Sequence, residues 1–309
     1  GSAAQLQNSL NTIRKDFLLL HDFMQIMRPL MTALSLGEGQ GRSYNRINYG
    51  RLVAGALTDG VDMQQQQDMS DAATSVTPNE IGVQAIIPRT TLRRSADRNL
   101  ESNLATIIAH AYTLKEDQDC CAIATSFTSQ LGGSTTVLGV GHATAMETRL
   151  RMGNNLTTPE PVTGDIHFVA HPCSLHAVAM RLVPLADVPV GTTAYTPTGT
   201  TVTVGPGRDG EGLSEDILVQ GRKAIKRLGG MMVHEDANVT AGANSGYHSL
   251  AFGREGTMFV EEFPADMVEQ IDASLRAREY NFVGSYGVGV YRPAAFGIDA
   301  FFDATIPTA

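Results

Sequence analysis

The stretch that decides the fold is Ile81-Gly82-Val83-Gln84-Ala85-Ile86-Ile87. Ile81, Val83, Ala85 and Ile87 fall on one side at a two-residue period, which is the spacing of a β-strand. An earlier extended segment runs from Tyr44 to Leu57, and a polar tip with four consecutive glutamines, residues 59–71, lies between the two. Residues 41–94 therefore predict a long hairpin with too little apolar surface to be stable alone. We expect it to lie on another part of the protein or on a neighbouring subunit.

A long helix is predicted over residues 95–130, directly after the hairpin. Its expected apolar face consists of Leu100, Leu104, Ile107, Ile108, Ala111 and Leu114. Ser95 or Asp97 would cap its start, and Gly132-Gly133 would end it. Such a helix spans about 50 Å, which suits a plate-like building block better than a compact enzyme domain. Cys120-Cys121 lies on this helix and is expected in or near the core.

Apolar side chains at alternating spacings of three and four mark residues 5–36. The stripe comprises Leu10, Ile13, Phe17, Leu20, Met24, Met27, Met31 and Leu34. Pro29 should kink or break this helix, because proline lacks an amide hydrogen and clashes with the preceding turn. The pattern predicts an N-terminal arm that docks through Leu10, Phe17 and Met24. An ordinary amphipathic helix packed on its own core is the alternative.

The remainder of the chain alternates helix and strand signals. Helices are predicted over 142–152, 174–182, 214–228 and 267–277. Strands are predicted over 165–170, from 231 and over 286–290. Residues 187–212, rich in Gly, Thr and Pro, predict strands joined by an exposed loop.

Composition and charge limit the function classes. The chain has 309 residues, 42% of them hydrophobic, and a net charge of −9. No apolar run reaches the roughly 18 residues of a membrane span, and no signal peptide opens the chain. Three cysteines form no disulfide framework and favour a reducing compartment. Without a basic cluster, sequence-specific DNA binding is not expected.

The sequence contains no pattern that is typical of a catalytic site. Residues 205–210 match a dinucleotide-binding glycine pattern, but Pro206 and the Arg208-Asp209 pair fit the required strand-to-helix turn badly. His167 and His171 lie four apart on a predicted strand-to-turn, so their spacing predicts no metal site. No catalytic residue, cofactor or metal ligand is therefore expected.

The order of parts resembles the major capsid proteins of tailed bacteriophages, which share the Johnson fold. Four phrases carry the resemblance: RLVAGALTDG at 51–60, VTPNEIG at 76–82, FVAHP at 168–172 and SLAFGREG at 249–256. The resemblance implies an α+β chain with an N-terminal arm, an extended hairpin loop, a long spine helix in a peripheral domain, and an α/β axial domain. The corresponding segments are 1–40 for the arm, 41–94 for the hairpin, 95–135 for the spine helix, 136–250 for the axial domain, and 251–309 for return strands and a helix.

The resemblance also implies a function. Such proteins form hexamers and pentamers of an icosahedral shell around double-stranded DNA, with portal, scaffolding and sometimes decoration proteins, and they assemble in the bacterial cytoplasm. Some members crosslink neighbours through a lysine on the hairpin, but residues 41–94 contain no lysine. We therefore expect no crosslink of that kind. Alternatives are an encapsulin-like nanocompartment shell or a soluble nucleotide-binding α/β enzyme.

Two groups of hairpin residues are expected to contact neighbouring subunits. The first is the tip: Asp59, Asp62, Met63, Gln64, Gln67, Asp68 and Asp71. The second is the arginines at the base: Arg42, Arg46, Arg51, Arg89, Arg93 and Arg94. Arginine suits intersubunit ion pairs because its planar fork binds a carboxylate through two hydrogen bonds.

Overall fold

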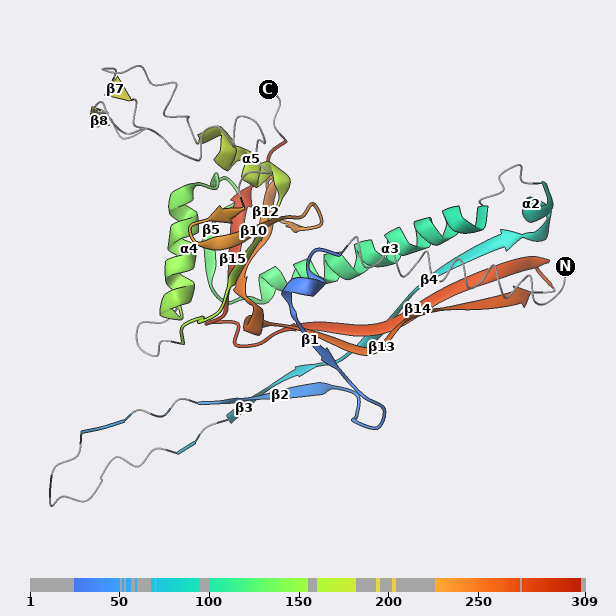
Figure 1. The fold of residues 1–309 in the computed structure, drawn as a ribbon, viewed down its shortest axis with the longest axis horizontal. Coiled ribbons are helices and arrows are strands. Elements are labelled where there is room, and N and C mark those ends of the chain that lie inside the picture. Colours follow the sequence, from blue (N-terminus) through green and yellow to red (C-terminus); the bar gives the residue numbers. More distant parts are fainter. Residues whose placement is uncertain are drawn as a thin grey trace. The chain divides into compact units, whose positions relative to one another are not determined.

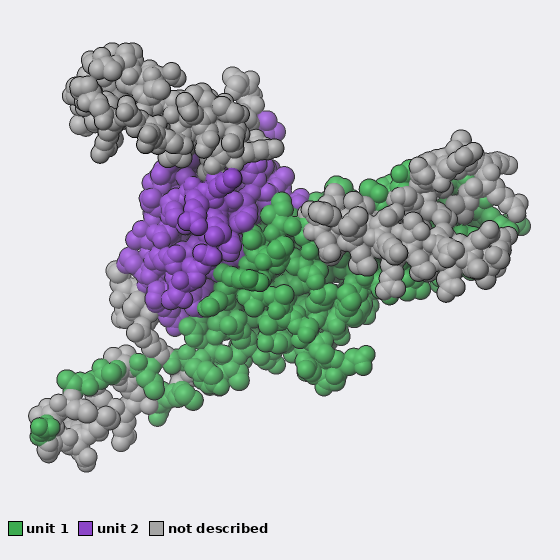
Figure 2. All heavy atoms as spheres, in the orientation of Figure 1, with its two compact units in different colours: residues 1–123, 254–293 green, residues 124–253, 294–309 purple. Residues whose placement is uncertain are grey.

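The computed structural model describes residues 25–50, 52, 54–56, 59, 68–69, 71–94, 100–154, 160–181, 193–194, 202–203, 226–272 and 274–306. The chain divides into two compact units, each built from separate stretches of sequence (Figure 2). Unit 1 comprises residues 1–123 and 254–293, and unit 2 comprises residues 124–253 and 294–309.

Unit 1 is organised around a four-stranded sheet in the order β1-β13-β14-β4 (Figure 1). The strands are β1 (Thr32–Ser35), β13 (Thr257–Asp272), β14 (Ala277–Val290) and β4 (Asn79–Pro88). β13 and β14 form a long antiparallel hairpin. β4 pairs antiparallel with β14 at one edge, and β1 pairs parallel with β13 at the other. The short helix η5 (Arg254–Gly256) leads into β13.

The predicted strand at 81–87 is confirmed, because Ile81, Val83, Ala85 and Ile87 alternate with more exposed neighbours along β4. The register places Val83 opposite Phe282 and Ala85 opposite Tyr280, so the less exposed side of β4 continues the buried side of β14. Its pairing differs from the expectation. β4 is not the return strand of the hairpin but part of the long sheet, since β14 supplies a ten-residue ladder.

The hairpin's actual return strand is β3 (Asp71–Val76), which pairs antiparallel with β2 (Tyr44–Tyr49). Within the part of the chain that the structure describes, these two strands pair only with each other. The hairpin is therefore a two-stranded ribbon, and the chain passes from β3 into β4 through Thr77-Pro78.

The long helix is confirmed in shortened form as α3 (Leu100–Ala122), which continues into the 3₁₀ turn η2 (Ile123–Ser126). The possible caps Ser95 and Asp97 lie outside the described residues. The expected end at Gly132-Gly133 is wrong, because residues 130–132 form strand β5. A one-turn helix, α2 (Arg89–Arg94), separates β4 from α3.

The expected apolar face of α3 is largely wrong. Ile107, Ala111 and Leu114 are exposed, while Ile108 is buried. The buried stripe contains Ile108, Ala109, Tyr112, Thr113, Glu116, Asp117, Cys120 and Cys121. The buried stripe thus includes two carboxylates, of which Glu116 pairs with Arg28 and Asp117 accepts a hydrogen bond from the Met27 amide.

α3 runs along the long sheet, and a glycine allows their close approach (Figure 1). A Cβ on Gly284 of β14 would collide with the Tyr112 hydroxyl. The rings of Tyr112 and Tyr286 meet edge to face, with centroids 6.3 Å apart, an arrangement that aromatic pairs favour. The core of unit 1 therefore lies between α3 and one face of the sheet, where Phe259, Tyr280 and Phe282 are fully buried.

The helix predicted over residues 5–36 is wrong for its last part, and residues 1–24 lie outside the described residues. Pro29 sits in the 3₁₀ turn η1 (Arg28–Leu30), and the chain continues as strand β1. The predicted break at Pro29 is confirmed, whereas the helical placement of Met31 and Leu34 is wrong. Met31 is nonetheless fully buried.

The helix predicted over 267–277 is also wrong, because β13 and β14 occupy these residues and the turn between them. Met267, Ile271 and Leu275 have the four-residue spacing of a helix face. Pairing with β14 along Thr257 to Asp272 nevertheless stabilises a strand here, because tertiary context overrides a local pattern. The strand predicted at 286–290 is confirmed as the end of β14.

Unit 2 contains a mixed sheet in the order β5-β15-β12-β6-β10-β9, with β11 paired to β12. The strands are β5 (Gln130–Gly132), β6 (Ile166–Ala170), β9 (Arg227–Leu228), β10 (Met231–Glu235), β11 (Thr240–Ala241), β12 (Gly246–Gly253) and β15 (Gly297–Asp303). Its helices are α4 (Val140–Met152) and α5 (Pro172–Arg181). Phe168, Phe252 and Phe302 are fully buried in its core.

Most local predictions for unit 2 are confirmed: the helices at 142–152 and 174–182, and the strands at 165–170 and from 231. Of the helix predicted over 214–228, all but the last three residues lie outside the described residues, and Arg227–Leu228 is a strand. Between 187 and 212 the structure describes only the paired strands β7 (Thr193–Ala194) and β8 (Val202–Thr203). No described helix is long and apolar enough to cross a membrane.

Candidate assembly interface

The β2–β3 ribbon has an inner and an outer face. Along β2, Tyr44, Arg46 and Asn48 are partly covered, while Asn45, Ile47 and Tyr49 are exposed. This alternation follows from the two-residue period of a strand. The paired strands run in register from Tyr44 opposite Val76 to Tyr49 opposite Asp71.

The inner face holds the ribbon onto unit 1 through aromatic, polar and packing contacts. The Arg46 guanidinium lies 3.8 Å from the centroid of the Tyr291 ring. Arg292 donates a hydrogen bond to the carbonyl oxygen of Tyr49 at 3.3 Å. Val76 is buried against Gly287 and Gly289 of β14, where a Cβ on Gly289 would clash with it. The base of the ribbon is therefore fixed by its own chain.

The outer face exposes large apolar side chains. Ile47 is 50% and Tyr49 54% exposed, and Leu52 and Met69 farther along the loop are exposed still more. A two-stranded ribbon gains little stability by itself, and exposed apolar groups of this size mark interaction surfaces. The candidate docking surface comprises Ile47 and Tyr49 of this outer face, together with the exposed Leu52 and Met69 farther along the loop.

The predicted tip residues are only partly described. Asp59, Asp68 and Asp71 are exposed, and Asp71 begins β3. Asp62, Met63, Gln64 and Gln67 lie outside the described residues. The tip's role in contacting a neighbour stays a prediction.

The predicted arginine group is not brought together by the structure. Arg42 is exposed near the ribbon base, and Arg46 stacks on Tyr291 of its own chain. Arg89, in contrast, follows the far end of β4, where its amide donates to the carbonyl oxygen of Arg276 at 2.9 Å. A ten-residue strand, about 33 Å long, separates the two places. Arg51 lies outside the described residues, as do the side chains of Arg93 and Arg94 in α2.

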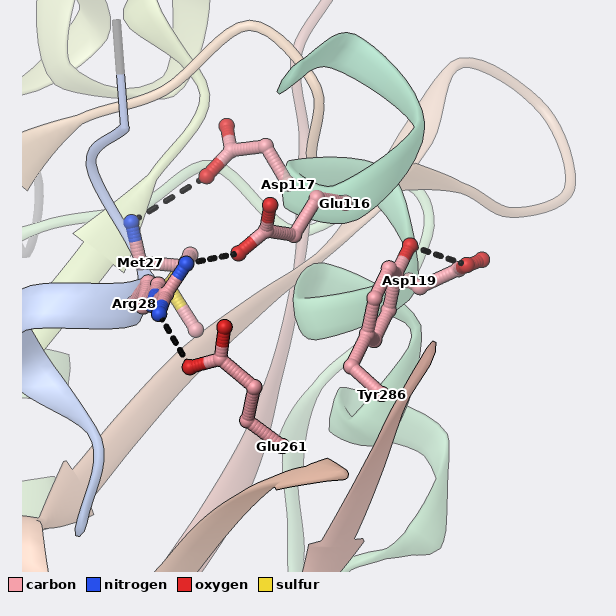
Figure 3. A network of polar contacts seen from close by, with 7 residues as sticks. All are labelled: Met27, Arg28, Glu116, Asp117, Asp119, Glu261 and Tyr286. Atoms are coloured by element: carbon pink, nitrogen blue, oxygen red, sulfur yellow. Dashed lines mark hydrogen bonds and ion pairs between the residues drawn. The ribbon is translucent and has the colours of Figure 1, made fainter. Parts of the chain in front are cut away.

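The N-terminal segment is anchored by a polar network on α3 and β13 (Figure 3). One nitrogen of Arg28 lies 3.3 Å from Glu116 Oε1, and the other lies 2.6 Å from Glu261 Oε2. The guanidinium also lies 4.8 Å from the centroid of the Phe259 ring. Charge-assisted hydrogen bonds of this kind are stronger than neutral ones. Arg28 thereby ties the arm to two elements at once.

The preceding residue satisfies a second buried carboxylate. The Met27 amide donates to Asp117 Oδ1 at 3.1 Å, and both residues are buried. A buried backbone amide without such a partner would be costly. The predicted docking residues Leu10, Phe17 and Met24 lie outside the described residues, so their role stays a prediction.

Two tyrosines complete the network. Tyr286 donates its hydroxyl proton to Asp119 Oδ2 at 3.0 Å. Burial, followed by the charge of Asp119, raises the pKa of the Tyr286 phenol well above its ordinary value. Burial, followed by Glu116 and Glu261, likewise raises the pKa of Tyr112. We call this cluster the Arg28 clamp, because its hydrogen bonds and ion pairs join the N-terminal segment, α3, β13 and β14.

The sequence reading missed this clamp. Nothing in the sequence around Glu116-Asp117 indicates that these two carboxylates are buried, because Met27 and Arg28, which contact them, lie about ninety residues earlier. The one local signal of a turn at Arg28 is the next residue, Pro29, because a proline breaks the helix predicted from the apolar stripe.

Comparison with known proteins gives a uniform answer at the level of fold. No protein-family model and no curated protein matches the sequence. Solved phage structures do match. The capsid of Ralstonia phage GP4 is 14% identical with a TM-score of 0.61, over 91% of this chain and 88% of that one. A chain of Mycobacterium phage Che8 gives 14% identity and a TM-score of 0.61, over 92% of each chain.

The capsid of cyanophage P-SCSP1u agrees, with 13% identity and a TM-score of 0.59 over 91% of this chain and 89% of that one. The likeness takes in both units, since nine-tenths of the sequence is aligned. These matches show that the chain has the fold of phage capsid proteins.

Proposed function

We propose that the chain is the major capsid protein of a tailed phage, a Johnson-fold protein that assembles into hexamers and pentamers of an icosahedral shell. The observation that carries this proposal is the likeness to phage capsids over about nine-tenths of both chains. The exposed apolar side chains on the outer face of the ribbon support it.

The ribbon is proposed to lie on a neighbouring copy of the chain. Its inner face is held by Tyr291 and Arg292, so it keeps a defined direction, and its outer face offers Ile47 and Tyr49 to the neighbour. Burying apolar surface of this kind contributes about 25 cal/mol per Å². Because residues 41–94 lack lysine, buried area rather than a lysine crosslink would hold the copies together.

The Arg28 clamp is proposed to set where the N-terminal arm leaves unit 1. With Met27 and Arg28 fixed on α3 and β13, residues before 25 start from one place in every copy. The arm can then reach the same neighbouring surface each time.

The main partner is therefore other copies of this chain, in the shell of a virion assembled in the bacterial cytoplasm. Portal, scaffolding and decoration proteins would complete the particle. Packaged double-stranded DNA would be enclosed without sequence-specific contact, since a net charge of −9 repels the phosphate backbone. A structural, non-enzymatic role follows from this proposal. The glycine-rich segment 205–210 lies outside the described residues.

Electron microscopy of the purified full chain, alone and with its scaffolding protein, tests the proposal. Rings of five and six copies, or closed icosahedral shells, are expected. Shells filled with a protein cargo and no nucleic acid after production in the host would instead indicate a nanocompartment. A chain that remains monomeric under all these conditions and binds nucleotide would overturn the shell function.

A further inference from the structure

Two histidines that are distant in sequence meet on the sheet of unit 2. His167 lies on β6 and His234 on β10, 67 residues apart, and His167 Nδ1 is 3.2 Å from His234 Nε2. β6 and β10 are neighbouring parallel strands whose register places His167 opposite Met232 and His234 opposite Val169. The backbone ladder therefore places both side chains on the same face of the sheet, within reach of each other.

The distance between the two nitrogens suits a metal ion. An ion bound about 2.0–2.1 Å from each of two nitrogens 3.2 Å apart sees them at roughly 100°. That angle falls between octahedral and tetrahedral coordination. In the hydrogen bond one ring donates an N–H to the lone pair of the other. If that proton moves to the other nitrogen of the donor ring, His167 Nδ1 and His234 Nε2 each offer a lone pair to the metal ion, and no proton is released.

Both histidines are partly buried, and their neighbours on this face of the sheet are largely apolar. Met232 lies directly opposite His167 and two residues before His234, which places its thioether on the same face of the sheet. Phe252 of β12, with its ring centroid 6.0 Å from that of His167, borders the other side.

We propose that His167 and His234 chelate a single transition-metal ion. Imidazole nitrogens suit copper, nickel and zinc, and the general order of affinities places Cu²⁺ first. Water completes the coordination, since the rings remain partly exposed. The ion ties β6 to β10 and stabilises unit 2. This site does not depend on the shell function.

The test uses the purified full chain, titrated with copper(II) sulfate by calorimetry, with electron paramagnetic resonance of the bound ion and thermal unfolding as second readouts. Binding of one Cu²⁺ per chain, nitrogen hyperfine coupling and a raised Tm are expected, because an ion that binds only the folded state stabilises it. The variants His167→Asn and His234→Asn should each lose this binding. His110→Asn, which changes an exposed histidine on α3, should keep it.

No saturable binding to the wild-type chain would overturn the proposal, as would binding that survives unchanged in both variants. If a variant fails to fold, the spectrum of the wild-type complex decides. A spectrum without coupling to two imidazole nitrogens would exclude the His167–His234 site.

Discussion

The β2–β3 ribbon and the β13–β14 hairpin are both antiparallel pairs, yet their own chain covers only one of them. β13–β14 has β4 and β1 at its edges and α3 over one face, and Tyr280 and Phe282 are fully buried there. The ribbon leaves Ile47 and Tyr49 about half exposed. The same local structure thus draws its stability from inside the subunit in one case and, as proposed, from a neighbour in the other. Substitutions should reveal this as a descending series of losses in the free energy of unfolding.

The largest loss is expected beneath α3. Phe282→Ala should lower the free energy of unfolding by about 3–5 kcal/mol, because it removes a fully buried ring and leaves a cavity. Urea denaturation followed by circular dichroism measures this. The control is Val268→Ala on β13, which is 60% exposed and should change stability by no more than about 0.5 kcal/mol. Equal losses in the two variants would contradict the one-sided cover of the sheet.

The next loss is expected at the arm clamp. Arg28→Ala removes the cation that pairs with Glu116, whose side chain is 2% exposed, and should cost about 1–3 kcal/mol. Lys115→Ala is the matched control, since it removes an ion pair with Asp119 that is far more exposed and should cost no more than about 0.5 kcal/mol. If both variants unfold at the same urea concentration as the wild type, Arg28 is not a clamp.

A smaller loss is expected at the ribbon base. Arg46→Ala removes the guanidinium from the Tyr291 ring and should cost about 0.5–1 kcal/mol. Because the contact holds the ribbon, limited proteolysis should cut the ribbon faster in this variant. Arg42→Ala, which changes an exposed neighbour, should leave the cleavage rate unchanged. Identical cleavage of all three proteins would show that the stacking does not restrain the ribbon.

The smallest effect on stability should accompany a severe effect on assembly. Ile47→Ser combined with Tyr49→Ser should change the free energy of unfolding by no more than about 0.5 kcal/mol, because both side chains are exposed in the subunit. Shell formation, followed by sedimentation and electron microscopy, should nevertheless fail. Val140→Ser with Met152→Ser alters two apolar residues of α4, each 43% exposed, as a control. Normal shells from the ribbon variant would refute the docking surface.

The sequence reveals local periods better than it reveals partners. The two-residue period of β4 was visible in Ile81 to Ile87, but its pairing with β14 was not, because nothing local specifies a strand two hundred residues away. Around Ile271 the local pattern even pointed to a helix, which the β13–β14 ladder overrides. The same limit applies to α3, where the buried Glu116 pairs with Arg28, 88 residues earlier in the chain.

The candidate interface, like the fold, can be predicted from the sequence only in part. A polar tip between extended segments indicated a reaching hairpin, and the exposed Asp59, Asp68 and Asp71 agree with that reading. The arginines near its ends looked like one group because they flank the same segment, yet β4 carries Arg89 far from Arg46. The outer apolar face was missed, since Ile47 and Tyr49 alternate with polar residues as any half-buried strand would.

The parallel pairing of β1 with β13 also has a consequence for synthesis. Thr32 lies opposite Met258, so β1, the first strand of unit 1, has no partner strand until most of the chain has been translated. The central stretch 124–253, which forms most of unit 2, emerges well before that partner. Pairings between distant segments fold slowly and leave apolar surface open in the meantime. Met27, Met31 and the less exposed side of β4 therefore lack the cover of β13 and β14 until residues 257–290 have been translated, whereas β2 and β3 can pair long before that.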